Sequence, residues 1–143
     1  MKIRDTSGWT IFIFGLLALL LGLVGLIRPE LLLSMLGFEV LSRAQRAAGD
    51  YTIVFMTASS MASFNMGIYY TLAAWNNLRK FYSWTVPFRL LTFAIFTTIS
   101  LAGIAPLRFI GVGLWELTGA LATGIALYTE NHSRQLRSHE KPA

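Results

Sequence analysis

The sequence predicts an all-α fold: a four-helix transmembrane bundle with a short interfacial helix after the first span. Residues 6–27, 51–78 and 90–107 contain no charged residue, and residues 109–129 contain only Glu116. Each stretch approaches the ~20 residues that a helix needs to cross ~30 Å of hydrocarbon. Apolar residues make up 55% of the 143-residue chain and charged residues 13%, more apolar surface than a soluble domain of this size buries. We therefore expect residues 1–129 to form one integral membrane domain and residues 130–143 a polar tail.

The first span is expected over residues 8–27. Ala18 and Gly22 form a small-xxx-small pair, which lets another helix approach closely, and we favour packing within the chain over a homodimer contact. The apolar run follows basic residues, as in a signal peptide, but it is too long for one. Arg28-Pro29-Glu30 follows it in place of a small-residue cleavage site, so we expect the helix to be retained.

A short helix is expected next. Pro29 suits a first helical position, and Glu30 suits the positive end of a helix dipole. Residues 31–38 are apolar but too few to span, so we expect residues 31–41 to lie along the membrane surface. Residues 42–50 form a polar connection to the next span.

The remaining spans are expected over residues 51–76, 87–104 and 107–128. The second is rich in alanine and serine, and the third is predicted to begin at Pro87. A tight hairpin at residues 103–106 joins the last two. Short connections make neighbours in sequence antiparallel neighbours in space.

The distribution of Lys and Arg predicts the orientation. Eight basic residues lie on the side shared by both termini: Lys2, Arg4, Arg79, Lys80, Arg89, Arg134, Arg137 and Lys141. Four lie on the other side: Arg28, Arg43, Arg46 and Arg108. Both termini should therefore face the cytoplasm. The net charge of +5 is accounted for by helix ends near lipid head groups and does not indicate a nucleic-acid partner.

Glu116 is the principal candidate for a functional residue. An ionised carboxylate facing lipid is costly, so Glu116 should face the bundle interior and be protonated or paired. It shares a small, polar helix face with Gly113, Ala120 and Thr123. Either a structural, hydrogen-bonded or ion-paired carboxylate or a catalytic acid or base fits this position.

Four further residues are candidates with simpler alternatives. Asp50 either caps the second span or joins Glu116 in a catalytic cavity. Asn65 either bonds to another helix or lines a ligand site, and Arg108 is a second candidate ligand-lining residue. Arg89, near the predicted start of the third span, is expected to snorkel to the interface.

No cofactor or metal is expected. The chain has no cysteine, and both of its histidines lie in the polar tail, so the spans offer no thiolate or imidazole ligand. The expected partners are the lipid bilayer, other membrane proteins or further copies of the chain, and a lipophilic small molecule.

Several local features resemble the small four-helix membrane proteins of the DoxX-like and BphX-like group. They are the sequence from Leu26 to Leu32, the following Met35-Leu36-Gly37-Phe38, the entry to the second span at residues 46–50, and the hairpin at residues 103–106. The resemblance covers most of residues 8–129. It implies a compact four-helix bundle and no particular catalytic residue.

Three functions are compatible with these features. We favour a non-enzymatic accessory or assembly subunit of a membrane system. The alternative is a membrane-embedded enzyme acting on a lipophilic metabolite of a biosynthetic or degradative pathway, with Glu116 as acid or base. A small-molecule transporter would need several copies of so small a chain.

Overall fold

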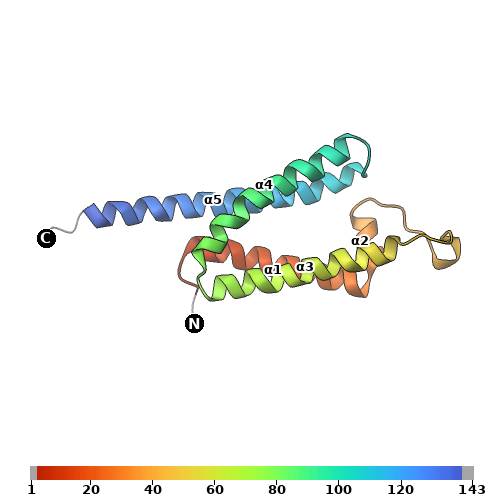
Figure 1. The fold of residues 1–143 in the computed structure, drawn as a ribbon, viewed down its shortest axis with the longest axis horizontal. Helices are drawn as coiled ribbons and strands as arrows, with labels where there is room; N and C mark the ends of the chain where they lie inside the picture. The colour runs from red at the N-terminus through yellow and green to blue at the C-terminus, as the bar shows by residue number, and fades with distance from the viewer. Residues whose placement is uncertain (1–2, 140–143) are drawn as a thin grey trace.

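The computed structural model describes residues 3–139, and this part of the chain is helical without any strand (Figure 1). Five α-helices follow one another: α1 Thr6–Ile27, α2 Pro29–Met35, α3 Thr52–Trp75, α4 Arg79–Leu101 and α5 Ile110–His139. Two single-turn 3-10 helices are η1, Arg43–Gln45, and η2, Leu107–Phe109. The predicted all-α class is confirmed.

The long helices form two antiparallel pairs, α1 with α3 and α4 with α5. Glycines bring α1 and α3 together: a Cβ atom on Gly67 would lie 2.5 Å from the backbone nitrogen of Leu19. A Cβ atom on Gly22 would likewise lie 2.5 Å from the backbone nitrogen of Phe64, and Ser63 donates a hydrogen bond to the carbonyl of Ala18. The small-residue stripe of α1 therefore packs within the chain.

Ionic contacts hold the two pairs together at one end. Arg79, at the start of α4, donates to Asp5 before α1 and to Glu130 on α5, each at 2.5 Å. Glu130 also accepts from the backbone and the hydroxyl of Ser7, at 2.7 and 2.8 Å. Arg134 adds a 2.9 Å contact to Asp5. This end joins the N-terminal segment, the α3–α4 connection and α5.

At the other end the two pairs diverge, as Figure 1 shows. The turn after α2 bridges the gap, because the rings of Phe38 and Phe109 lie 5.9 Å apart and Gly37 lies against the side chain of Arg108. Leu33 of α2 is buried. A short helix thus follows α1 as expected, and its depth relative to the membrane surface stays a prediction.

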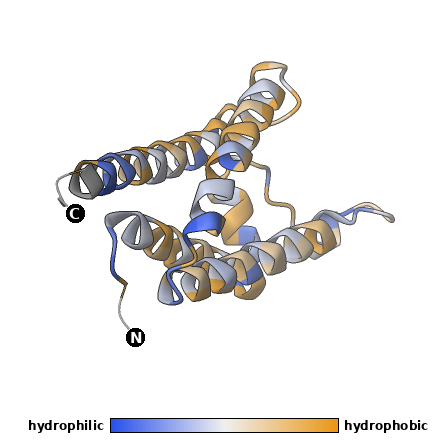
Figure 2. Cartoon of the chain, turned by 60° about the vertical axis from the view of Figure 1, so that its left-hand side comes forward, coloured by the Kyte–Doolittle hydropathy of each residue, from blue (hydrophilic) through white to orange (hydrophobic). Residues whose placement is uncertain are grey.

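Three of the described helices are long and apolar enough to cross a membrane: α1, α4, and α5 with its preceding turn. Their outward faces carry large apolar side chains, and Figure 2 shows the hydrophobic colouring along them, with hydrophilic residues gathered towards chain ends and loops. The helix α3 has comparable length and no charge, but serine, threonine and asparagine lower its hydropathy. Of the four apolar spans that the sequence predicts, three are therefore apolar enough to cross a membrane, and α3 is not among them.

Two predicted boundaries were wrong. The third long helix starts at Arg79 instead of Pro87, which lies inside it. A proline in a helix removes one backbone donor and strains one turn, and tertiary packing tolerates that cost here. The last helix was expected to end at residue 128, but α5 continues to His139, and Glu130 and Arg134 in this continuation pair with Arg79 and Asp5.

Candidate functional site

The inner faces of the long helices meet in successive layers. Residues seven apart lie two turns apart on one face of a helix, and Glu130, Thr123 and Glu116 follow this spacing on α5. Glu130 and Thr123 pair with α1: Glu130 accepts a hydrogen bond from Ser7, and the hydroxyl of Thr123 lies 3.0 Å from that of Thr10. Glu116 belongs to the next layer, which contains the most unusual side chains of the molecule.

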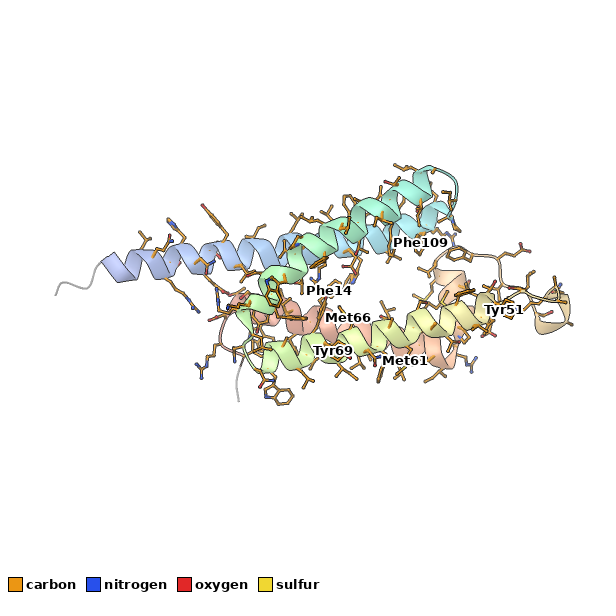
Figure 3. The ribbon with its side chains drawn as sticks, viewed as in Figure 1. Phe14, Tyr51, Met61, Met66, Tyr69 and Phe109 are labelled. Atoms are coloured by element: carbon orange, nitrogen blue, oxygen red, sulfur yellow. The ribbon has the colours of Figure 1, made fainter. Side chains whose placement is uncertain are left out.

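An ion pair occupies that layer. A carboxylate oxygen of Glu116 lies 3.9 Å from Nε of Arg89 on α4, and the Arg89 side chain is only 2% exposed. The guanidinium carbon lies 3.5 Å from the ring centre of Phe14 on α1 and 4.9 Å from that of Tyr70 on α3. A desolvated cation over an aromatic face gains about 2 kcal/mol. All four long helices therefore contribute to holding one buried charge; Figure 3 labels Phe14 between the two pairs.

Arg89 is buried and does not snorkel, which corrects the expectation from the sequence. It lies ten residues into α4, or ~15 Å from Arg79 along the axis, so its side chain starts far from the N-terminal end of the helix. Gly119 on α5 makes room for it, since a Cβ atom there would lie 2.6 Å from a terminal guanidinium nitrogen. A larger residue at this position would force the guanidinium or the ring of Phe14 to shift.

The three guanidinium nitrogens of Arg89 donate no hydrogen bond to any described residue. A separation of 3.9 Å from Glu116 is an ionic contact, longer than a hydrogen bond. Glu116 itself keeps 19% of its side chain exposed. The pair thus combines a locked cation with an accessible carboxylate.

An apolar cavity of about 420 Å³ lies where the two helix pairs begin to diverge. All five α-helices, the turn after α2 and η2 contribute to its wall: Leu21, Gly22, Leu32, Leu36, Phe38, Met56, Ser59, Ser60, Ser63, Phe96, Phe109 and Val112. Ser63 and Ser59 bond to backbone carbonyls, whereas the buried hydroxyl of Ser60 has no partner among the described residues. The wall is therefore apolar with one hydroxyl left to bond.

The cavity and the ion pair share the same helix faces. Leu21 and Phe96 lie seven residues from Phe14 and Arg89, and Val112 lies four from Glu116. At ~1.5 Å per residue, the ion pair is one to two turns, or about 6–10 Å, from these lining residues. The ion pair thus lies between the cavity and the end of the molecule where ionic contacts join the two helix pairs.

A second cavity of about 260 Å³ adjoins the first. Both are lined by Leu21, Leu32, Leu36 and Val112. The second also reaches Trp115 on α5 and Arg108 in η2. Apolar residues shared by the two cavities therefore lie between the first cavity and the cation of Arg108.

The sequence-predicted residues are distributed over separate places. Glu116 faces Arg89, and Arg108 lines the second cavity. Asn65 is partly buried on α3 and does not line either cavity.

Asp50 lies before α3 and bonds locally. It accepts hydrogen bonds from the hydroxyl and the backbone nitrogen of Thr52, at 2.5 and 2.9 Å, and pairs with Arg46 at 2.9 Å. These donors hold the pKa of Asp50 below its usual range, the Thr52 hydroxyl having the largest effect. The structure does not bring Asp50 to Glu116. Its carboxylate instead accepts from Thr52, the first residue of α3, whose N-cap residue is Tyr51.

Sequence reasoning did not identify Phe14, Tyr70, Ser60 or the inward position of Arg89. One signal for Arg89 was available: within residues 81–129 the charged residues are Arg89, Arg108 and Glu116. A cation and a carboxylate among so few charges in neighbouring apolar helices are natural partners.

Comparisons with protein-family models, with curated proteins and with solved structures found no match. Between residues 3 and 139, no group of three or more histidine and acidic side chains is arranged to hold a metal ion. The function is therefore argued from the cavity and its neighbouring charges.

Proposed function

We propose that this protein is a four-pass membrane protein that binds a lipophilic molecule between its two helix pairs. The observation that carries this proposal is the cavity of about 420 Å³ to whose lining all five helices contribute. Its size lies within the range of about 300–1,000 Å³ typical of small-molecule sites, and its apolar wall with few polar groups is also typical. Divergence of the helix pairs allows entry from the surrounding lipid.

The proposed fourth span is α3. Since α1 is antiparallel to α5, and α5 is antiparallel to α4, α1 and α4 run in the same direction. The chain between them must return across the membrane, and α3 is the described helix of sufficient length, with 24 residues. Close packing on α1 covers part of its polar surface. On the distribution of basic residues, both termini are then cytoplasmic.

The topology has a direct test. Reporters inserted near residue 45 and near residue 77 should lie on opposite sides of the membrane, with a C-terminal reporter on the same side as the one near residue 77. Finding the first two on one side would refute α3 as a span.

We propose that binding serves a non-enzymatic accessory or assembly role, as favoured from the sequence. The ion pair supports this, because contacts from four helices to one buried cation stabilise the closed end of the cavity. The resemblance of residues 8–129 to the DoxX-like and BphX-like group is likewise retained as a proposal.

One observation favours an enzyme as the second candidate. Glu116 keeps part of its side chain exposed and lies one turn from Val112, which lines the cavity. A ligand in the cavity would therefore approach a carboxyl group suited to acid or base catalysis.

Binding is tested by filling the cavity. Val112→Phe places a larger side chain in the cavity wall, whereas Leu114→Phe places the same ring on an exposed position of the same helix. Each variant is purified in lipid nanodiscs, and bound lipophilic compounds are extracted and identified by mass spectrometry. We expect a compound that accompanies the wild type and Leu114→Phe but is depleted from Val112→Phe. Equal recovery from all three proteins would refute binding in the cavity.

A further inference from the structure

We propose that the cavity's ligand is a single-chain amphiphile with a carboxylate: its chain occupies the two adjoining cavities and its carboxylate binds Arg108. This inference rests on the proposed binding of a lipophilic molecule and adds the chemistry of its polar end. A long-chain fatty acid is the simplest member of this class.

Arg108 is held at the outer end of the apolar surface. It lines the second cavity beside Trp115, and its side chain packs against Gly37 in the turn after α2. A Cβ atom on Gly37 would lie 3.0 Å from Cβ and 3.2 Å from Cδ of Arg108, and the φ of +85° at Gly37 also suits glycine. The aliphatic stem is thereby positioned, while the residue as a whole stays exposed.

The charge of Arg108 is not neutralised within the described chain. The ion pairs found there join Asp5, Asp50, Glu116 and Glu130 to other arginines. The side chain of Arg108 takes part in none of these ion pairs, whereas the buried Arg89 is paired with Glu116. A guanidinium binds a carboxylate through two parallel hydrogen bonds, which combine charge with defined geometry.

The chain of the ligand contributes little selectivity. Lipid tails are as apolar as the cavity wall, so moving an alkyl chain from the bilayer into the cavity gains no hydrophobic energy. Discrimination must therefore come from packing and from the polar end. The two cavities adjoin and share four lining residues, so the proposed ligand is one chain that extends through both. This favours a fatty acid over a two-chain phospholipid.

Trp115 provides a reporter, since it lines the second cavity with Arg108. The three other tryptophans, each at least half exposed, are replaced by phenylalanine: Trp9, Trp75 and Trp84. The protein is placed in phosphatidylcholine nanodiscs, and quenching of Trp115 fluorescence is titrated with a long-chain fatty acid brominated at mid-chain. Its methyl ester and a brominated phosphatidylglycerol are titrated separately.

We expect the acid to quench at lower concentration than the ester. Arg108→Gln should weaken apparent binding of the acid about tenfold, which corresponds to ~1.4 kcal/mol, and leave the ester unchanged. Arg28→Gln removes another exposed arginine, one that lines neither cavity, and should have no effect. Arg108→Lys keeps the charge without the paired donors and should recover part of the lost affinity.

The inference is overturned if Arg108→Gln leaves binding of the acid unchanged, if it weakens acid and ester equally, or if phosphatidylglycerol quenches at lower concentration than the acid. Val112→Phe separates these failures from failure of the proposed function. If it abolishes quenching by acid and ester alike while Arg108→Gln has no effect, the cavity binds lipophiles and the carboxylate assignment is wrong. If Val112→Phe changes no titration, binding in the cavity itself is refuted, and the carboxylate inference with it.

Discussion

Removing the carboxylate of Glu116 should destabilise the protein chiefly by leaving Arg89 buried without a counter-charge. At 3.9 Å and an effective dielectric constant of about 20, the Coulomb attraction is about 4 kcal/mol. The contacts of Arg89 with Phe14 and Tyr70 remain and offset part of this loss. We therefore expect Glu116→Gln to lower the free energy of unfolding by about 3 kcal/mol, at the lower end of values for broken buried pairs.

A double-mutant cycle isolates the pair. Arg89→Met removes the cation and leaves the carboxylate of Glu116 with no counter-charge, so it should also destabilise by several kcal/mol. In the variant carrying both substitutions neither charge remains, and its cost should be less than the sum of the two single costs by about 3 kcal/mol. Unfolding in bicelles with increasing dodecyl sulfate, followed by circular dichroism, measures each free energy.

Additive costs would refute the reasoning, since they would show that the two side chains do not interact. If Glu116→Gln left the free energy of unfolding unchanged, the reasoning would also be refuted, because the native carboxyl would then already be uncharged. The cycle has a use for function as well. Any activity lost in Glu116→Gln is assigned to acid or base chemistry only if it stays lost in the double variant, in which no buried charge is left without a partner.

Two further predictions concern helix packing and the hydrogen bonds of Asp50. Gly67→Ala should lower the free energy of unfolding by about 1–3 kcal/mol, because its Cβ would meet the backbone of α1. As a control, a Cβ at Gly111 would meet no atom within 4 Å, so Gly111→Ala should leave the free energy of unfolding unchanged or raise it by up to ~1 kcal/mol. Equal losses of stability for the two variants in the same unfolding assay would contradict this prediction. The lowered pKa of Asp50 means that its stabilising bonds to Thr52 are present above its unfolded pKa of about 3.9 and are lost as pH falls through its lower folded value. The amide resonance of Thr52 should therefore titrate with a midpoint below about 3.9, and in Asp50→Asn this transition should be absent. A midpoint above about 3.9 would show that the hydrogen bonds from Thr52 to Asp50 are not formed.

The sequence by itself predicted helices that are long and apolar enough to cross a membrane, and the position of most helices. Those properties are local: a charge-free run of sufficient length favours a membrane helix whatever its partners are, and residues 8–27 and 51–76 correspond closely to α1 and α3. Glu116 was also identifiable, since a lone carboxylate in an apolar run has few favourable environments. Local signals misplaced the start of α4, because proline is equally compatible with a first turn and with a helix whose packing outweighs its cost.

Tertiary structure decided which of these residues act together. Arg89 was expected at the interface because a long cationic side chain has two favourable solutions, reaching water or finding a buried partner, and sequence spacing does not choose between them. The glycine on α5 and the aromatic rings on α1 and α3 made the buried solution available. Asp50 bonds locally at the start of α3, since the hydroxyl and the backbone amide of Thr52 satisfy its carboxylate without any contact to a distant part of the chain. The cavity arose from the divergence of two packed helix pairs, a property of helix crossing that no single segment encodes.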